Sequence, residues 1–179
     1  AFAARLAGTF LMYWAFLSSQ FTVGSGMDFS SIEAGNGLLF LLAAGLRLGV
    51  FPVLVPFSRE IPLRREAGTL LRFVVPASSL ALLTRLDGLV MPAGWAVILS
   101  ILALAASVYG VIRYFFASSE LTGRSFWVTA LAGMATVSIV RGEGEAALIW
   151  STVLLLFGTF QSLHSYRLPG QWWLMLPGF

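Results

Sequence analysis

Long apolar segments follow one another along this chain, separated by short links rich in glycine, serine, proline and charged residues. A helix needs about 20 mostly apolar residues to cross the roughly 30 Å hydrocarbon core of a bilayer. Six stretches fit this description: 2–20, 35–57, 67–84, 93–116, 125–140 and 146–163. The pattern predicts an all-α integral membrane bundle of about six transmembrane helices, forming a single domain over residues 1–179.

The end of the chain, 165–179, is apolar but too short to span a bilayer. Its adjacent tryptophans, Trp172 and Trp173, suit the headgroup region, where aromatic side chains gather. We expect this tail to lie along the inner surface of the membrane or to pack on a partner subunit.

Composition supports the membrane interpretation and excludes several functions. Only 11% of the residues are charged, against roughly a quarter in soluble domains, and the mean hydropathy is +0.87. The few charges lie in separate short links, so the chain offers no basic patch for nucleic acid. The absence of cysteine excludes disulfides and thiolate metal sites, and a single histidine cannot form a metal cage.

The eleven basic residues are all arginines, and their distribution predicts an orientation. Basic residues are retained in short loops on the cytoplasmic side of a membrane. If the N-terminus lies inside, only Arg85 and Arg141 fall outside, whereas seven arginines fall at inside ends or loops: Arg5, Arg59, Arg64, Arg65, Arg113, Arg124 and Arg167. The chain is therefore predicted to have both termini inside.

Two further arginines, Arg47 and Arg72, fall within predicted spans. A guanidinium at membrane depth is costly, so it normally faces protein or water and marks a functional site. Arg72 lies close to the inner end of its span, and it also fits a residue whose side chain reaches the interface. Arg47 lies deeper and is the stronger candidate.

Three prolines are predicted to interrupt the spans that carry these arginines. Pro52 and Pro56 should break the second span below Gly49, and Pro76 should break the third. Backbone groups freed in this way must be covered by protein or water, and such breaks mark ion paths in transporters. The hydroxyls of Ser78 and Ser79 could satisfy carbonyls freed by Pro76. The alternative is that transmembrane helices simply tolerate proline.

These features resemble a known family. Residues 45–86 are similar to the antiporter-like membrane subunits of respiratory complex I, the NADH:quinone oxidoreductase, and of Mrp-type cation/proton antiporters. Arg47 stands where that family has a buried lysine, Pro52 matches a proline five residues later, 58–68 matches a cytoplasmic loop, and Arg85-Leu86 closes the next helix. Residues 120–127 resemble a later loop and helix start of the same family.

The resemblance implies a membrane subunit of an energy-converting complex in a bacterial inner or organellar membrane, with other integral subunits and lipids as partners. Arginine cannot replace lysine as a proton carrier, because a guanidinium stays protonated. The family's second buried lysine, which aligns near Pro76, is missing. The chain is therefore predicted to be a shortened and degenerate member, non-catalytic, with a scaffolding role or residual ion conduction through a path lined by Arg47, Pro52, Pro56, Arg72 and Pro76.

Two alternatives remain open at this stage. The chain could be a structural or pigment-associated transmembrane subunit of a photosynthetic or respiratory assembly, or a stand-alone secondary transporter. No cofactor is predicted, but His164, at the inner end of the last span, could ligate a tetrapyrrole or bond a quinone at a subunit interface. It also fits an interfacial polar anchor.

Overall fold

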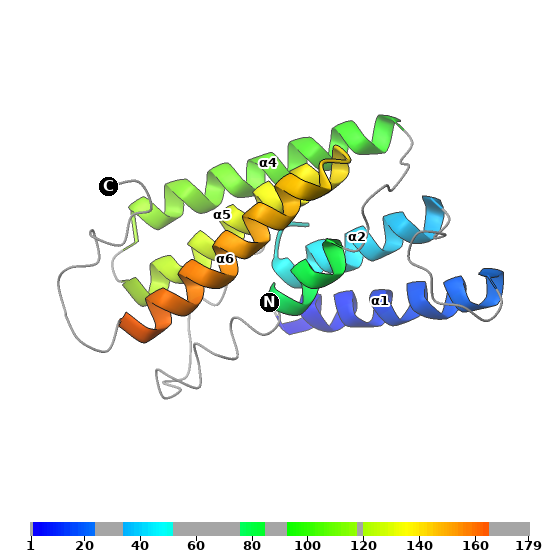
Figure 1. Ribbon diagram of the computed structural model, residues 1–179, viewed down its shortest axis with the longest axis horizontal. Helices are drawn as coiled ribbons and strands as arrows, with labels where there is room; N and C mark the ends of the chain where they lie inside the picture. The colour runs from blue at the N-terminus through cyan, green and yellow to red at the C-terminus, as the bar shows by residue number, and fades with distance from the viewer. Residues whose placement is uncertain (1, 24–33, 52–75, 85–92, 118–119, 165–179) are drawn as a thin grey trace.

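A computed structural model of the chain describes residues 2–23, 34–51, 76–84, 93–117 and 120–164. Its long helices are α1 (Phe2–Val23), α2 (Ala34–Leu48), α4 (Ala93–Phe115), α5 (Glu120–Val140) and α6 (Gly144–His164). A short helical segment covers 76–83, and these described ranges contain no strand. The all-helical architecture expected from the sequence is confirmed. Figure 1 shows α1 paired with α2, and α4, α5 and α6 gathered in a second group.

The first group is an antiparallel pair held by close approach of α1 and α2. A Cβ added at Gly8 would lie 2.9 Å from the carbonyl oxygen of Ala43, so only glycine allows this spacing. Near the other end of the pair, the Ser18 hydroxyl donates a 3.1 Å hydrogen bond to Oδ1 of Asn36. A small residue and a polar contact therefore fix the register of the pair.

The second group is built on equally close backbone contacts between α4 and α5. A Cβ added at Gly133 would lie 2.7 Å from the carbonyl oxygen of Ala103, and one added at Gly110 would lie 2.7 Å from that of Phe126. Between these points, the buried hydroxyl of Ser107 donates a 2.9 Å hydrogen bond to the Ala130 carbonyl. Small residues and a hydroxyl at the crossing are typical of helices that pack in lipid, where hydrophobic association is weak.

The ends of α2 and α5 share one capping geometry. Gly49 follows α2 with φ of 75°, and the amide of Val50 bonds back to the Gly45 carbonyl at 2.8 Å. Gly142 follows α5 with φ of 75°, and the amide of Glu143 bonds back to the Ser138 carbonyl at 2.8 Å. This six-to-one bond, with a left-handed glycine before its donor, is the Schellman motif. Each glycine thus ends its helix and reverses the chain.

Large apolar side chains lie on the outside of the bundle, and several hydroxyls lie inside. Phe10 and Trp14 on α1 are each 67% exposed, and Leu156 on α6 is 65% exposed. The buried polar side chains share a small hydroxyl group, and they are Ser79, Ser107, Thr129, Thr136, Ser138 and Ser151. Several of these hydroxyls bond a carbonyl one turn back in their own helix, as Thr136 does with Ala132 at 2.7 Å.

Length and composition together separate one helix from the others. Among the residues that the structure describes, only Gly94–Phe115 of α4 is both long and apolar enough to cross a membrane. Shorter apolar helices cover Asn36–Leu48, Ser125–Val140 and Gly144–Phe160. α1, α4, α5 and α6 begin and end within five residues of predicted spans, whereas α2 ends at Leu48, well before the predicted end at 57. The prediction of six membrane-crossing helices stays a prediction.

Candidate functional site

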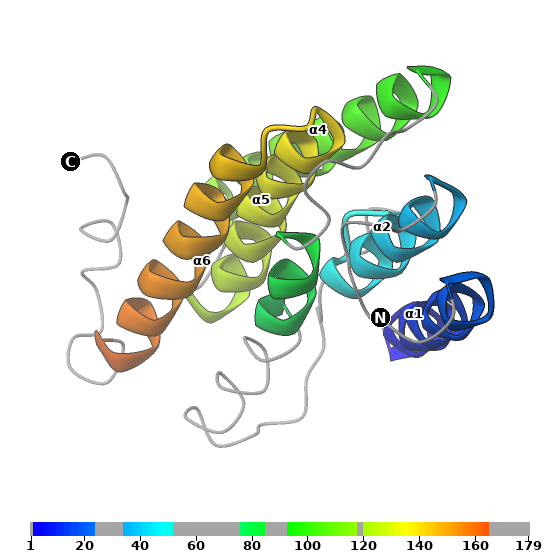
Figure 2. The ribbon, with the colours of Figure 1, turned by 45° about the vertical axis from the view of Figure 1, so that its right-hand side comes forward.

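Arg47 lies where three segments of the chain meet. It belongs to the last turn of α2, and its side chain crosses α1 at Gly8, where an added Cβ would lie 2.9 Å from the Arg47 Cγ. Its Nη2 donates a 2.9 Å hydrogen bond to the Ser78 hydroxyl, and its Nη1 lies 3.6 Å from the sulfur of Met12. The segment 76–83 that carries Ser78 lies between the two helix groups (Figure 2).

The acceptors around Arg47 are neutral. The Ser78 hydroxyl and the Met12 thioether accept from its two terminal nitrogens. Its Nε is buried without a hydrogen-bond partner. Within the described ranges, no carboxylate forms an ion pair with it. The positive charge is stabilised by the C-terminal end of α2 itself, because the partial negative charge of a helix C-terminus favours a cation in the last turn.

The helix that carries Arg47 ends immediately after it. α2 stops at Leu48, and the chain turns at Gly49, which is three residues before Pro52. Phe51 returns over Gly45, and its ring occupies the space that a Cβ at Gly45 would need. The helix therefore ends on the N-terminal side of Pro52, because the left-handed Gly49 ends it before the proline could clash with it.

The other residues predicted for the ion path have different outcomes. Pro76 is buried and stands at the start of the described helical segment 76–83, next to the contact between Arg47 and Ser78. Pro52, Pro56 and Arg72 lie outside the described residues. The structure thus places Arg47 beside the Pro76 segment and does not test the remaining members.

His164, a candidate for binding a tetrapyrrole or quinone or for an interfacial polar anchor, is the last residue of α6. The position of its side chain is outside the described part of the structure. Among the side chains that are described, no group of three histidine, cysteine or carboxylate residues could hold a metal ion.

Sequence reasoning missed the contacts that hold Arg47. Ser78 was expected to satisfy backbone carbonyls near Pro76, and the bond that its hydroxyl accepts from the guanidinium was not foreseen. Met12 and Gly8, on α1, carried no signal as site residues. Their participation follows from the antiparallel pairing of α1 with α2, which places the start of α1 beside the end of α2.

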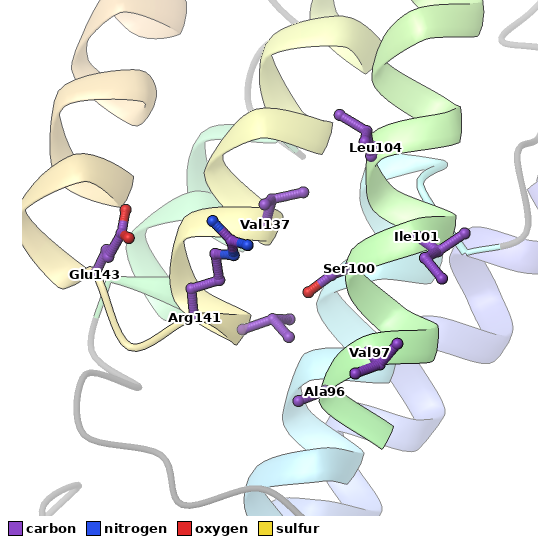
Figure 3. A pocket seen from close by; sticks show the side chains of 9 residues that line it. Ala96, Val97, Ser100, Ile101, Leu104, Val137, Arg141 and Glu143 are labelled. Atoms are coloured by element: carbon purple, nitrogen blue, oxygen red, sulfur yellow. The ribbon is translucent and has the colours of Figure 1, made fainter. Parts of the chain in front are cut away.

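A second feature is an open groove in the group formed by α4, α5 and α6. It has a volume of about 680 Å³ and runs between the first turns of α4 and the last turns of α5 (Figure 3). Val97, Ile101 and Leu104 line it from α4. Arg141 and Glu143, in the turn between α5 and α6, lie at its edge.

Comparisons of the whole chain with known protein families, with curated proteins and with solved structures give no match.

Proposed function

We propose that this chain is a helical membrane subunit of an energy-converting complex, a shortened and degenerate relative of the antiporter-like subunits, in which Arg47 supplies a fixed positive charge at a broken helix. One observation carries the proposal. The Arg47 guanidinium lies in the last turn of α2, which ends at Leu48. Neutral acceptors on α1 and on the segment 76–83 bind it.

The distribution of apolar side chains supports a membrane environment. On α4, Val97, Ile101 and Val108 are at least 50% exposed, and the same is true of Phe10 on α1 and Leu156 on α6. Exposed apolar surface of this extent on several helices marks contact with lipid or with partner subunits. The interior, in contrast, contains hydroxyls and glycines at close helix crossings, as in membrane bundles.

The surroundings of Arg47 favour a structural and electrostatic role over proton transfer. A proton relay needs a group that releases its proton, and a guanidinium does not. Ser78 and Met12 also offer no second titratable group within hydrogen-bond distance. The charge would instead orient the segment 76–83 against α2 and repel cations from the break, leaving the subunit a scaffold with at most residual ion conduction.

Substitutions at Arg47 test this role. The tagged chain is purified with its partner subunits from its native membrane as wild type, Arg47→Lys and Arg47→Leu. Arg113→Leu is the matched control, because Arg113 is an exposed arginine in the last turn of another helix, 5.2 Å from the Phe126 ring centroid. Recovery of the partner subunits and proton flux in reconstituted vesicles are the two readouts.

We expect Arg47→Leu to reduce recovery of the partner subunits, and Arg47→Lys and Arg113→Leu to retain it. The isolated wild-type chain should conduct no protons above the background of empty vesicles. Proton flux through the isolated wild type that is lost in Arg47→Leu would contradict a fixed-charge role. Unchanged recovery and flux in Arg47→Leu would remove Arg47 from the mechanism.

A further inference from the structure

The groove between α4 and α5 combines a long apolar wall with two opposite charges at one end. Val97, Ile101 and Leu104, spaced three or four residues apart, present one face of α4 along it and are each more than half exposed. Val137 of α5 forms part of the opposite wall. Its volume of about 680 Å³ lies within the usual range for sites that bind small molecules.

Arg141 and Glu143 supply the charges. Both are exposed, and neither forms an ion pair with another described residue. Figure 3 shows the two side chains separated on the turn between α5 and α6, with the Ser100 side chain reaching from α4 toward Arg141. The Schellman turn at Gly142 explains the separation, because it reverses the chain between the two residues.

We propose that this groove binds a phospholipid with a primary-amine headgroup, such as phosphatidylethanolamine. The phosphate would lie on Arg141, where a guanidinium offers paired donors, and the ammonium would lie on Glu143. One acyl chain would run along Val97, Ile101 and Leu104. The inference rests on the proposed membrane location, since the turn that carries both charges is the end of two helices and so would lie at headgroup level.

The pair of charges decides the headgroup. A purely anionic lipid would gain the contact with Arg141 but would be repelled by Glu143. A choline headgroup has no N–H to donate to the Glu143 carboxylate, so it would keep the phosphate contact and only a weaker, purely electrostatic attraction to Glu143. Of these three headgroups, only ethanolamine can form charge-assisted hydrogen bonds with both residues.

The experiment measures which lipids stay with the purified chain. The full chain is reconstituted in vesicles of equal parts phosphatidylethanolamine, phosphatidylcholine and phosphatidylglycerol, extracted in mild detergent, and analysed for retained lipid by native mass spectrometry. The variants are Arg141→Gln and Glu143→Gln. The matched control is Glu145→Gln, which changes an exposed glutamate two residues further along, in the first turn of α6. A second arm adds free phosphoethanolamine in excess.

We expect wild type and Glu145→Gln to retain phosphatidylethanolamine about threefold to fivefold over phosphatidylcholine, since an exposed ion pair contributes up to about fivefold in affinity. Glu143→Gln should lose this preference but still retain lipid, and Arg141→Gln should retain less of every phospholipid. Free phosphoethanolamine should not displace the lipid, because it lacks the acyl chain.

Equal retention of the three lipids by wild type, or an unchanged preference in Glu143→Gln, would overturn the inference. Displacement by free phosphoethanolamine would also overturn it, since the groove would then contribute nothing. Extraction of the same membranes with alkaline carbonate separates this failure from that of the proposed function. A chain that stays in the membrane without lipid preference refutes only the lipid site, whereas a chain released by carbonate refutes the membrane subunit.

Discussion

The Nη2 of Arg47 donates a 2.9 Å hydrogen bond to the hydroxyl of Ser78, a residue 31 positions further along the chain. This bond connects the end of α2 to the helical segment 76–83. It therefore joins the end of α2 to the next described segment of the chain, and a charged side chain helps to fix the position of that segment.

Removing the Ser78 hydroxyl should destabilise the fold modestly. Ser78→Ala takes an acceptor from a charged donor, and hydrogen bonds to charged groups contribute about 1.5–3 kcal/mol. Because Ser78 is exposed, we expect a loss near 1 kcal/mol in the free energy of unfolding in detergent. Thr84→Ala is the control, since its hydroxyl bonds only a carbonyl three residues back at 3.0 Å. A loss in Ser78→Ala no larger than in Thr84→Ala would contradict the role of the bond.

Gly45 should be intolerant of any side chain. The Cβ of alanine there would overlap the Phe51 ring, including its Cγ next to the backbone, so the ring would have to leave its place on α2 or the chain reversal after α2 would have to open. Overpacking of this kind costs about 1–3 kcal/mol. Gly94→Ala is the matched control, because nothing lies within 4 Å of its added Cβ, and it should be neutral or stabilising. Thermal unfolding of both variants compares them, and equal midpoints would be inconsistent with the observed turn.

Gly133 should be required for the contact between α4 and α5. Alanine would place its Cβ 2.7 Å from the backbone carbonyl oxygen of Ala103, which cannot rotate away. We expect Gly133→Ala to cost about 1–3 kcal/mol of stability because the helices must separate. Gly123→Ala tests the interpretation, since its Cβ would meet side chains and no backbone: the Tyr114 ring at 3.2 Å, which can shift, and the Ala117 Cβ at 3.4 Å, an ordinary contact distance. The unfolding midpoint should fall further in Gly133→Ala, and the reverse order would show that the crossing is not limiting.

The sequence predicted the helices well because their signal is local. Apolar segments bounded by glycine, proline and charge predicted helices close to α1, α4, α5 and α6, and the structure has them. The end of α2 near Gly49 could also be predicted, since glycine and proline both terminate helices and Gly49 and Pro52 lie close together there.

The surroundings of the site could not be predicted in the same way. The partners of Arg47 come from α1 and from 76–83, and nothing in a single sequence states which helix faces meet. Met12 reads as an ordinary apolar residue, and it becomes a partner only because glycine at position 8 lets α1 approach α2 closely. The groove beside Arg141 likewise depends on how the first turns of α4 pack against the last turns of α5.

The membrane location of the bundle is the central claim, and cysteine labelling tests it most directly because the chain has no cysteine of its own. Single cysteines are introduced at Leu102, in the middle of α4, at Leu156 of α6, and at Glu143 in a turn, all of them exposed in the structure. Each variant is treated in proteoliposomes with a water-soluble maleimide that can reach both faces of the bilayer. We predict that the cysteine at position 143 reacts, and that those at 102 and 156 react only after denaturation in detergent. Rapid labelling of 102 and 156 in intact proteoliposomes would contradict the account.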